Sequence, residues 1–202
     1  MTDGDGTMNG LCVTDCTRCP ALVASRSRIV NGVGPADAPL MLVGEAPGEQ
    51  EDAQGEPFVG RSGQLLNEAL RTAGIAREAV RITNCVRCRP PDNRDPRAAE
   101  RSACAGWLEQ EIARVDPDVI LPVGKIPASH LLDRDVAVTR EAGSVEQRTL
   151  GGRARDLVIC VHPAAVLYDR SNGARLEAAI DTAVHLAGID PADVPQRRLG
   201  AF

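Results

Sequence analysis

Short apolar runs alternate along the chain with longer stretches in which apolar residues recur every three or four positions. The short runs predict strands at residues 40–43, 79–83, 117–123 and 157–161. The helical spacing predicts helices at residues 65–73, 97–115, 124–132 and 172–187. Strand and helix therefore alternate four times. This order predicts an α/β fold, a three-layer α/β/α sandwich around a central four-stranded parallel sheet.

The segments outside this alternation are polar, charged or rich in glycine. Residues 1–11 and the tail from about residue 190 to residue 202 are predicted to be loose. Residues 133–155 are predicted to form an irregular hairpin that covers one edge of the sheet. A chain of 202 residues is long enough for one real core, so a single domain over residues 1–202 is expected.

A long loop rich in glycine and acidic residues follows the first predicted strand. Residues 43–66 read VGEAPGEQEDAQGEPFVGRSGQLL. In open α/β sheets, ligands bind at the carboxyl ends of the strands, which is where this loop begins. Phe58 lies inside the loop in a chain with one tryptophan, one tyrosine and two phenylalanines. An aromatic ring in such a polar loop favours a stacking platform over a core residue.

Polar residues stand at or just after the carboxyl ends of three predicted strands. They are Glu45, Asn84 and His162. A single asparagine or histidine at such a position most often caps or turns the chain. Three of them at equivalent positions of parallel strands converge on one edge of the sheet, so together they predict a ligand or active site.

Composition narrows the classes of function. The chain has no run of eighteen apolar residues and no charged-then-apolar leader, so a cytoplasmic protein without a membrane segment is expected. The net charge of −5 argues against indiscriminate nucleic-acid binding but allows a local basic groove.

Seven cysteines are many for a cytoplasmic protein of this size, and in a reducing compartment they indicate metal binding or catalysis. They are too scattered for a ferredoxin-like carrier. Cys12, Cys16 and Cys19 have the spacing of a radical-SAM motif, but that barrel needs more strand–helix units than the four predicted here. Cys160 lies in a predicted strand and is interpreted as a small buried apolar residue.

Two other cysteine sets remain open from the spacing. The CxxC pair Cys16 and Cys19 with the CxxC pair Cys85 and Cys88 would suit tetrahedral zinc. The set Cys16, Cys19, Cys88 and Cys104 would instead hold a [4Fe–4S] cluster with four thiolates. The spacing alone does not separate zinc from iron–sulfur.

Three blocks of sequence resemble the family 4 uracil-DNA glycosylases, the iron–sulfur branch of that superfamily. They are residues 44–66, residues 82–96 (ITNCVRCRPPDNRDP) and residues 161–167 (VHPAAVL). The resemblance covers nearly the whole chain. It implies a four-stranded α/β/α sandwich that removes uracil from DNA and carries a structural [4Fe–4S] cluster. The implied cluster ligands are Cys16, Cys19, Cys88 and Cys104.

The resemblance also implies how the base would be held. A glycosylase takes its base out of the helix and reads it in a pocket. Phe58 would stack on the flipped uracil. The Asn84 amide offers one acceptor and one donor, which fit N3–H and O4 of uracil and mismatch cytosine. Glu51 is a candidate for crowding the C5 position and excluding thymine.

Bond cleavage would leave negative charge on uracil and positive character on the sugar. His162 would donate toward O2 of the departing base. Backbone N–H groups near Glu45 and Ala46 would assist, and Glu45 would orient or activate the attacking water. This gives an enzyme, a hydrolase of N-glycosidic bonds. The alternative is a non-catalytic iron–sulfur protein of the same fold that binds or senses damaged DNA.

Contact with DNA requires a local basic surface. Candidate contacts are Arg61, Arg87, Arg89, Arg94 and Arg97. Tyr168 or Arg170, after the histidine block, would fill the gap left by the flipped base. The expected partner is uracil-containing DNA, single or double stranded, bound by a monomer. A sliding clamp is a candidate protein partner.

Overall fold

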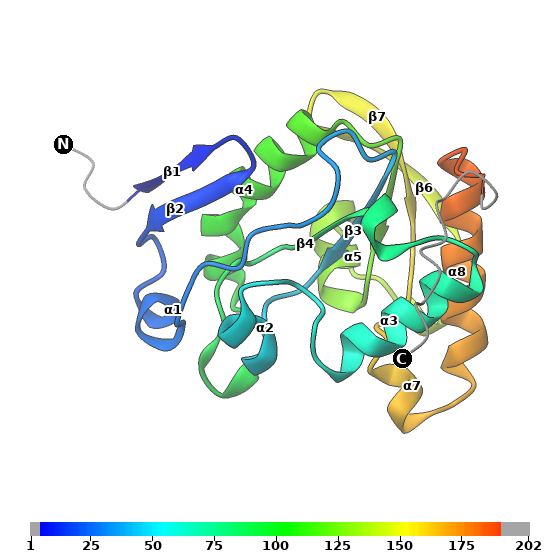
Figure 1. Ribbon diagram of the computed structural model, residues 1–202, viewed down its shortest axis with the longest axis horizontal. Helices are drawn as coiled ribbons and strands as arrows, with labels where there is room; N and C mark the ends of the chain where they lie inside the picture. Colours follow the sequence, from blue (N-terminus) through cyan, green and yellow to red (C-terminus); the bar gives the residue numbers. More distant parts are fainter. Residues whose placement is uncertain (1–4, 191–202) are drawn as a thin grey trace, which may run out of the picture.

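The computed structural model describes residues 5–190. Its centre is a five-stranded sheet with the strand order β4-β3-β5-β7-β6 (Figure 1). The strands are β3 (Leu40–Gly44), β4 (Arg81–Asn84), β5 (Val119–Pro122), β6 (Val145–Leu150) and β7 (Arg153–Val158). The strands β4, β3, β5 and β7 are parallel, and β6 is antiparallel to β7. The expected parallel arrangement therefore gains an antiparallel edge strand.

Helices cover both faces of this sheet. The longer ones are α3 (Arg61–Thr72), α4 (Ala98–Val115), α5 (Lys125–Leu132) and α8 (Asn172–Leu186). The shorter ones are α1 (Pro20–Ser25), α2 (Glu49–Gln54), η1 (Arg77–Ala79), η2 (Pro91–Asn93), α6 (Val138–Glu141) and α7 (Ala165–Tyr168). No helix among residues 5–190 is long and apolar enough to cross a membrane.

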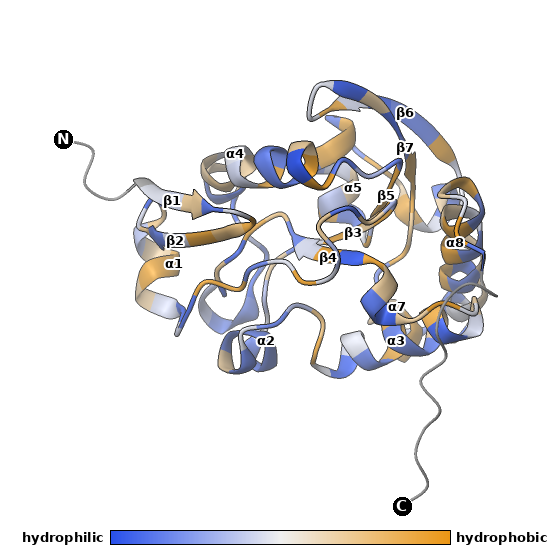
Figure 2. Ribbon diagram, turned by 45° about the horizontal axis from the view of Figure 1, so that its top comes forward, coloured by the Kyte–Doolittle hydropathy of each residue, from blue (hydrophilic) through white to orange (hydrophobic). Residues whose placement is uncertain are grey.

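Strand β3 shows how the three layers form. Its side chains alternate between the two faces of the sheet. Leu40 and Leu42 pack in one core cluster with residues of α3 and α8, whereas Met41 and Val43 pack in another with residues of α4 and α5. Orange and blue positions alternate along α8, as expected for a helix with one buried face (Figure 2). The predicted three-layer α/β/α sandwich is confirmed.

The prediction of four strands is wrong by one, and the fourth predicted strand is displaced. Residues 145–158 form the β6–β7 hairpin, and Cys160 adds only an isolated bridge to Val123. The hairpin turns at Gly151 and Gly152, whose φ angles are +58° and +91°. Two consecutive glycines accept such a turn readily, so the charged segment forms a hairpin at the sheet edge as predicted, but with regular paired strands.

The expectation of a loose segment at residues 1–11 is wrong for its described part. Strand β1 (Asp5–Asn9) pairs with β2 (Cys12–Cys16) in an antiparallel hairpin. This hairpin lies at the opposite end of the molecule from α8 (Figure 1). It packs on a third, smaller core cluster that includes Val13 and Trp107. Residues 1–4 and 191–202, the rest of the predicted loose ends, lie outside the described residues.

Candidate active site

The residues predicted to bind uracil line one cavity of about 550 Å³ at the carboxyl ends of β3 and β4. All six predicted residues are present: Glu45, Ala46, Glu51, Phe58, Asn84 and His162. Residues that sequence reasoning did not assign to the pocket also line it: Gly48, Ser62, Asn93, Ala164 and Leu167. The cavity therefore joins three separate sequence blocks, as parallel strands that end at one edge of a sheet would.

Gly44 lets the pocket residues approach one another. The Asn84 Oδ1 atom lies 2.3 Å from where a Cβ of residue 44 would stand, and the Phe58 ring lies 2.6 Å from it. No side chain fits between these groups. The glycine after the first strand is therefore required by the packing of the amide and the ring.

Phe58 is both a ring of the cavity wall and a core residue, although the sequence presented these as alternatives. Its ring lines the cavity, but it is only 7% exposed and belongs to the core cluster beneath α3. Its φ angle is +53°, an unusual value for a residue with a side chain. The backbone oxygen of Phe58 leaves no space for a Cβ at Gly63, so the start of α3 holds this turn in place. The Phe58 ring is therefore held in place by the core cluster and by the start of α3.

His162 is prepared to donate a hydrogen bond from Nε2. Its Nδ1 accepts the backbone N–H of Ala164 at 3.2 Å, so in the neutral ring the proton lies on Nε2. Burial lowers the pKa of His162, and the nearby Glu51 carboxylate opposes this shift. The imidazole is therefore neutral near pH 7. Its ring centre lies 6.1 Å from that of Phe58.

Asn84 presents an uncommitted amide. It ends β4 and is only 3% exposed. No side-chain hydrogen bond to it is found within residues 5–190. Because Asn84 lines the cavity, its amide is free to bind a ligand that supplies both an acceptor and a donor.

Glu51 holds the loop around the cavity. Its Oε1 accepts the N–H groups of Val59 at 3.0 Å and Gly60 at 2.8 Å, and its Oε2 accepts the N–H of Gly48 at 3.1 Å. These three bonds tie the start of α2 to the turn after Phe58. They give Glu51 a bracing role, and its suggested contact with C5 of the base stays a prediction.

The Glu45 carboxyl is poised to change protonation near neutral pH. Its pKa is raised to about 7, first by burial and then by the charge and a hydrogen bond of the Asp95 carboxyl, whereas the charge of Arg101 lowers it. A carboxyl with such a pKa in a cavity is suited to general-base chemistry. Asp95 belongs to the second sequence block and had no predicted role.

The four cysteines implied by the resemblance lie together at the end of the molecule that carries the β1–β2 hairpin. Cys88 and Cys104 are buried in the third core cluster, and Cys16 and Cys19 pack against it. Burial raises the pKa of Cys104 to about 11. Burial also raises the pKa of Cys19, and the neighbouring Cys88 and Cys16 raise it further.

The other cysteines lie elsewhere. Cys85 belongs to the core cluster beneath α4 and α5, where burial raises its pKa strongly. Cys160 is fully buried in the opposite cluster, in agreement with its interpretation as an apolar core residue. Cys12 is exposed. Across residues 5–190, no three His, Cys, Asp or Glu side chains converge tightly enough for a single metal ion.

Comparison with known families agrees with this geometry. A family model described as the uracil DNA glycosylase superfamily matches residues 31–187. This chain belongs to that superfamily. It is 43% identical to the type-4 uracil-DNA glycosylase of Thermotoga maritima over 164 residues, which cover 81% of this chain and 83% of that protein.

Two further type-4 uracil-DNA glycosylases extend the match. That of Pyrobaculum aerophilum is 41% identical over 87% of this chain and 90% of its own length. That of Archaeoglobus fulgidus is 39% identical over 77% of this chain and 80% of its own length. The resemblance inferred from three sequence blocks is therefore confirmed.

In this uracil DNA glycosylase superfamily member, one of the arginines predicted to contact DNA is buried instead of exposed. Arg87 is 1% exposed and pairs with Glu111, which also binds Arg81. Its assignment as a DNA contact is wrong, because a side chain that is buried and paired with Glu111 cannot reach a DNA phosphate. Arg61 and Arg97 are exposed, and Arg94 is engaged by Glu100 through two hydrogen bonds.

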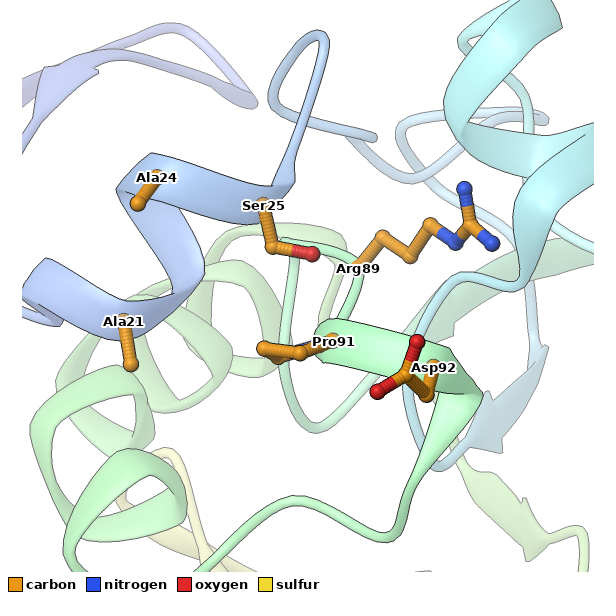
Figure 3. A pocket seen from close by; sticks show the side chains of 6 residues that line it. All are labelled: Ala21, Ala24, Ser25, Arg89, Pro91 and Asp92. Carbon is orange, nitrogen blue, oxygen red and sulfur yellow. The ribbon is translucent and has the colours of Figure 1, made fainter.

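A second hollow of about 340 Å³ lies between α1 and η2 (Figure 3). Its lining residues are Ala21, Ala24, Ser25, Arg89, Pro91 and Asp92. None of them is among the residues predicted to bind uracil. Arg89 donates to the Asn93 side chain at 2.8 Å and so links this hollow to the larger cavity. The larger cavity is the candidate active site.

Proposed function

We propose that this protein is a monofunctional uracil-DNA glycosylase. It flips uracil out of DNA and hydrolyses the N-glycosidic bond to leave an abasic site. The observation that carries this proposal is the single cavity of about 550 Å³ that gathers a ring, an amide, an imidazole and a carboxyl. The type-4 uracil-DNA glycosylases to which the chain is similar support the same substrate.

The base would be recognised by shape and by hydrogen bonds. Uracil stacks on the Phe58 ring while the Asn84 amide accepts from N3–H and donates to O4. Cytosine presents the opposite pattern at these atoms and is rejected by an amide held in one orientation. The uncommitted state of the Asn84 amide supports this role, since an amide that lines the cavity without a side-chain partner in residues 5–190 is free to bind the base.

Cleavage would rest mainly on electrostatic stabilisation. As the bond breaks, negative charge builds on the base, and Nε2–H of His162 donates to O2. Positive character builds on the sugar, and the ionised Glu45 carboxylate stabilises it and orients the attacking water. The backbone N–H groups near Ala46 assist the departing base. No covalent intermediate with the enzyme is needed.

A [4Fe–4S] cluster would be held by Cys16, Cys19, Cys88 and Cys104. The packing of these four cysteines in and against one core cluster supports it, since four thiolates are the usual ligands of a [4Fe–4S] cluster. Trp107 in the same cluster has a buried indole N–H without a partner in the described residues, a donor that a cluster sulfur would satisfy. When bound, the cluster supplies a cross-link between three chain segments.

An oligonucleotide that carries one deoxyuridine tests the activity. After incubation with the holoprotein and treatment with alkali, we expect strand cleavage at uracil in single- and double-stranded substrates and none at cytosine. Protein that binds uracil-containing DNA without releasing the base would support the non-catalytic alternative instead. In this proposal the enzyme acts as a monomer in the cytoplasm, and a sliding clamp is a candidate partner.

A further inference from the structure

Arg26 connects two of the proposed cluster ligands. It stands at the C-terminal cap of α1, where its backbone N–H binds the Leu22 carbonyl. Its Nη1 donates to the Cys88 sulfur at 2.9 Å, and its Nη2 donates to the Cys16 carbonyl at 2.7 Å. One planar guanidinium thus spans two ligand segments that lie more than 70 positions apart in the sequence.

The charge of Arg26 is not neutralised by an acid. Unlike Arg81 and Arg87, which share the Glu111 carboxylate, Arg26 forms no ion pair within residues 5–190. The acceptors of its side chain are a sulfur and a carbonyl oxygen. Its positive charge is therefore directed at the sulfur of a proposed ligand.

Two physical consequences follow for a cluster bound at these cysteines. Hydrogen bonds to ligand sulfur and nearby positive charge favour the more negative, reduced state of an iron–sulfur cluster. A rigid two-pronged donor also holds the Cys88 side chain in its ligating position, which lowers the entropy lost on binding.

We infer that Arg26 is a positioning residue of the cluster, which orients Cys88 and sets the reduction potential. This inference rests on the proposed [4Fe–4S] cluster. It adds a role that sequence spacing did not indicate, because Arg26 is one arginine in a basic segment and only the fold brings it to Cys88.

The test compares Arg26→Gln with Arg28→Gln. Arg28 is exposed, lies two positions further along the same segment, and loses the same charge in its variant. Iron content, the absorption near 400 nm and the reduction potential by film voltammetry are measured on each anaerobically purified holoprotein. We expect Arg26→Gln to shift the potential in the negative direction, with a roughly tenfold lower ratio of reduced to oxidised cluster at fixed potential, about 59 mV for one electron. Arg28→Gln is expected to match the wild type.

The outcomes separate this inference from the cofactor proposal. Wild-type protein without iron would overturn the cluster itself. Arg26→Gln with full iron content and the wild-type potential would overturn the role of Arg26 while the cluster stands. If Arg26→Gln does not fold, Arg26→Lys decides, since it keeps the charge but not the fork. An intermediate potential and faster loss of iron in air support the inference, and wild-type values for both contradict it.

Discussion

The base pocket and the cysteine cluster are built in different ways. Phe58 in the pocket belongs to a core cluster of 21 buried residues, whereas Cys88 and Cys104 belong to one of six. Asn84 ends a sheet strand that is paired along its length, but Cys16 ends a two-stranded hairpin outside that sheet. The pocket is therefore held by the main core. The cysteine end has a smaller core and depends more on polar contacts and on the proposed cluster that would cross-link its thiols. We therefore expect mutations in the pocket to change activity and mutations at the cysteine end to change stability first.

The largest effect is expected in the pocket. His162→Ala removes the donor to O2 of the departing base and should lower kcat by about 10²- to 10³-fold. Single-turnover release of uracil measures it. Cluster absorption and melting temperature should stay near wild type. A parallel loss of iron would show that the two regions are not independent.

Gly44→Ala should damage the pocket without removing any of its functional groups. The new Cβ would displace the Asn84 amide and the Phe58 ring, and a displacement near 1 Å costs about 10²-fold in rate. Gly106→Ala in α4 is the matched control, because a Cβ there meets nothing within 4 Å. Equal activities for the two variants would contradict the packing argument.

The cysteine end should respond in stability first. Cys104→Ala should lower the free energy of unfolding by about 2–5 kcal/mol, the range for loss of a native cross-link, as measured by denaturant titration. Cys12→Ala, at an exposed cysteine outside the ligand set, should be silent. If Cys12→Ala instead abolished the cluster, the radical-SAM spacing would be the correct reading of these cysteines.

Activity should depend on pH through Glu45. Because its pKa is raised to about 7, the ionised form is lost as the pH falls through neutrality, and kcat/KM should drop about tenfold per pH unit below 7. Asp95 raises that pKa, so Asp95→Asn should move the acid limb to lower pH. A pH profile that is unchanged in Glu45→Gln would remove Glu45 from the mechanism.

The smallest effect is expected at the rim. Tyr168 is 91% exposed at the end of α7 and lines the cavity. Tyr168→Ala should leave the melting temperature unchanged and lower activity on duplex DNA by roughly 3- to 10-fold, as for loss of a wedge that fills the gap behind a flipped base. Single-stranded substrate should be affected less. Arg170→Ala shows which of the two residues fills the gap.

Asp52 shows why the roles of some residues cannot be predicted from the sequence. It stands among four other acidic residues of one loop and had no arguable role. The fold buries it to 3% exposure, where both of its oxygens accept the N–H of Ser27 and so tie α2 to the segment after α1. Burial and partners of a charged side chain depend on what packs over it, which spacing does not reveal.

The sequence by itself determined the alternation of strands and helices and the residues that meet at the sheet edge. Apolar runs with regular periods dictate these elements, and parallel strands place their carboxyl ends together. Glu45, Asn84 and His162 were predictable for that reason.

Only the tertiary structure decided which charges face inward. Arg87 and Arg89 are two positions apart, yet Arg87 is enclosed with Glu111 and Arg89 reaches Asn93 at the cavity. The same holds for Arg26 at the Cys88 sulfur and for Asp95 beside Glu45. The contacts of Arg87, Arg26 and Asp95 join segments far apart in the chain, and their energies depend on local burial, a quantity that exists only after the chain has folded.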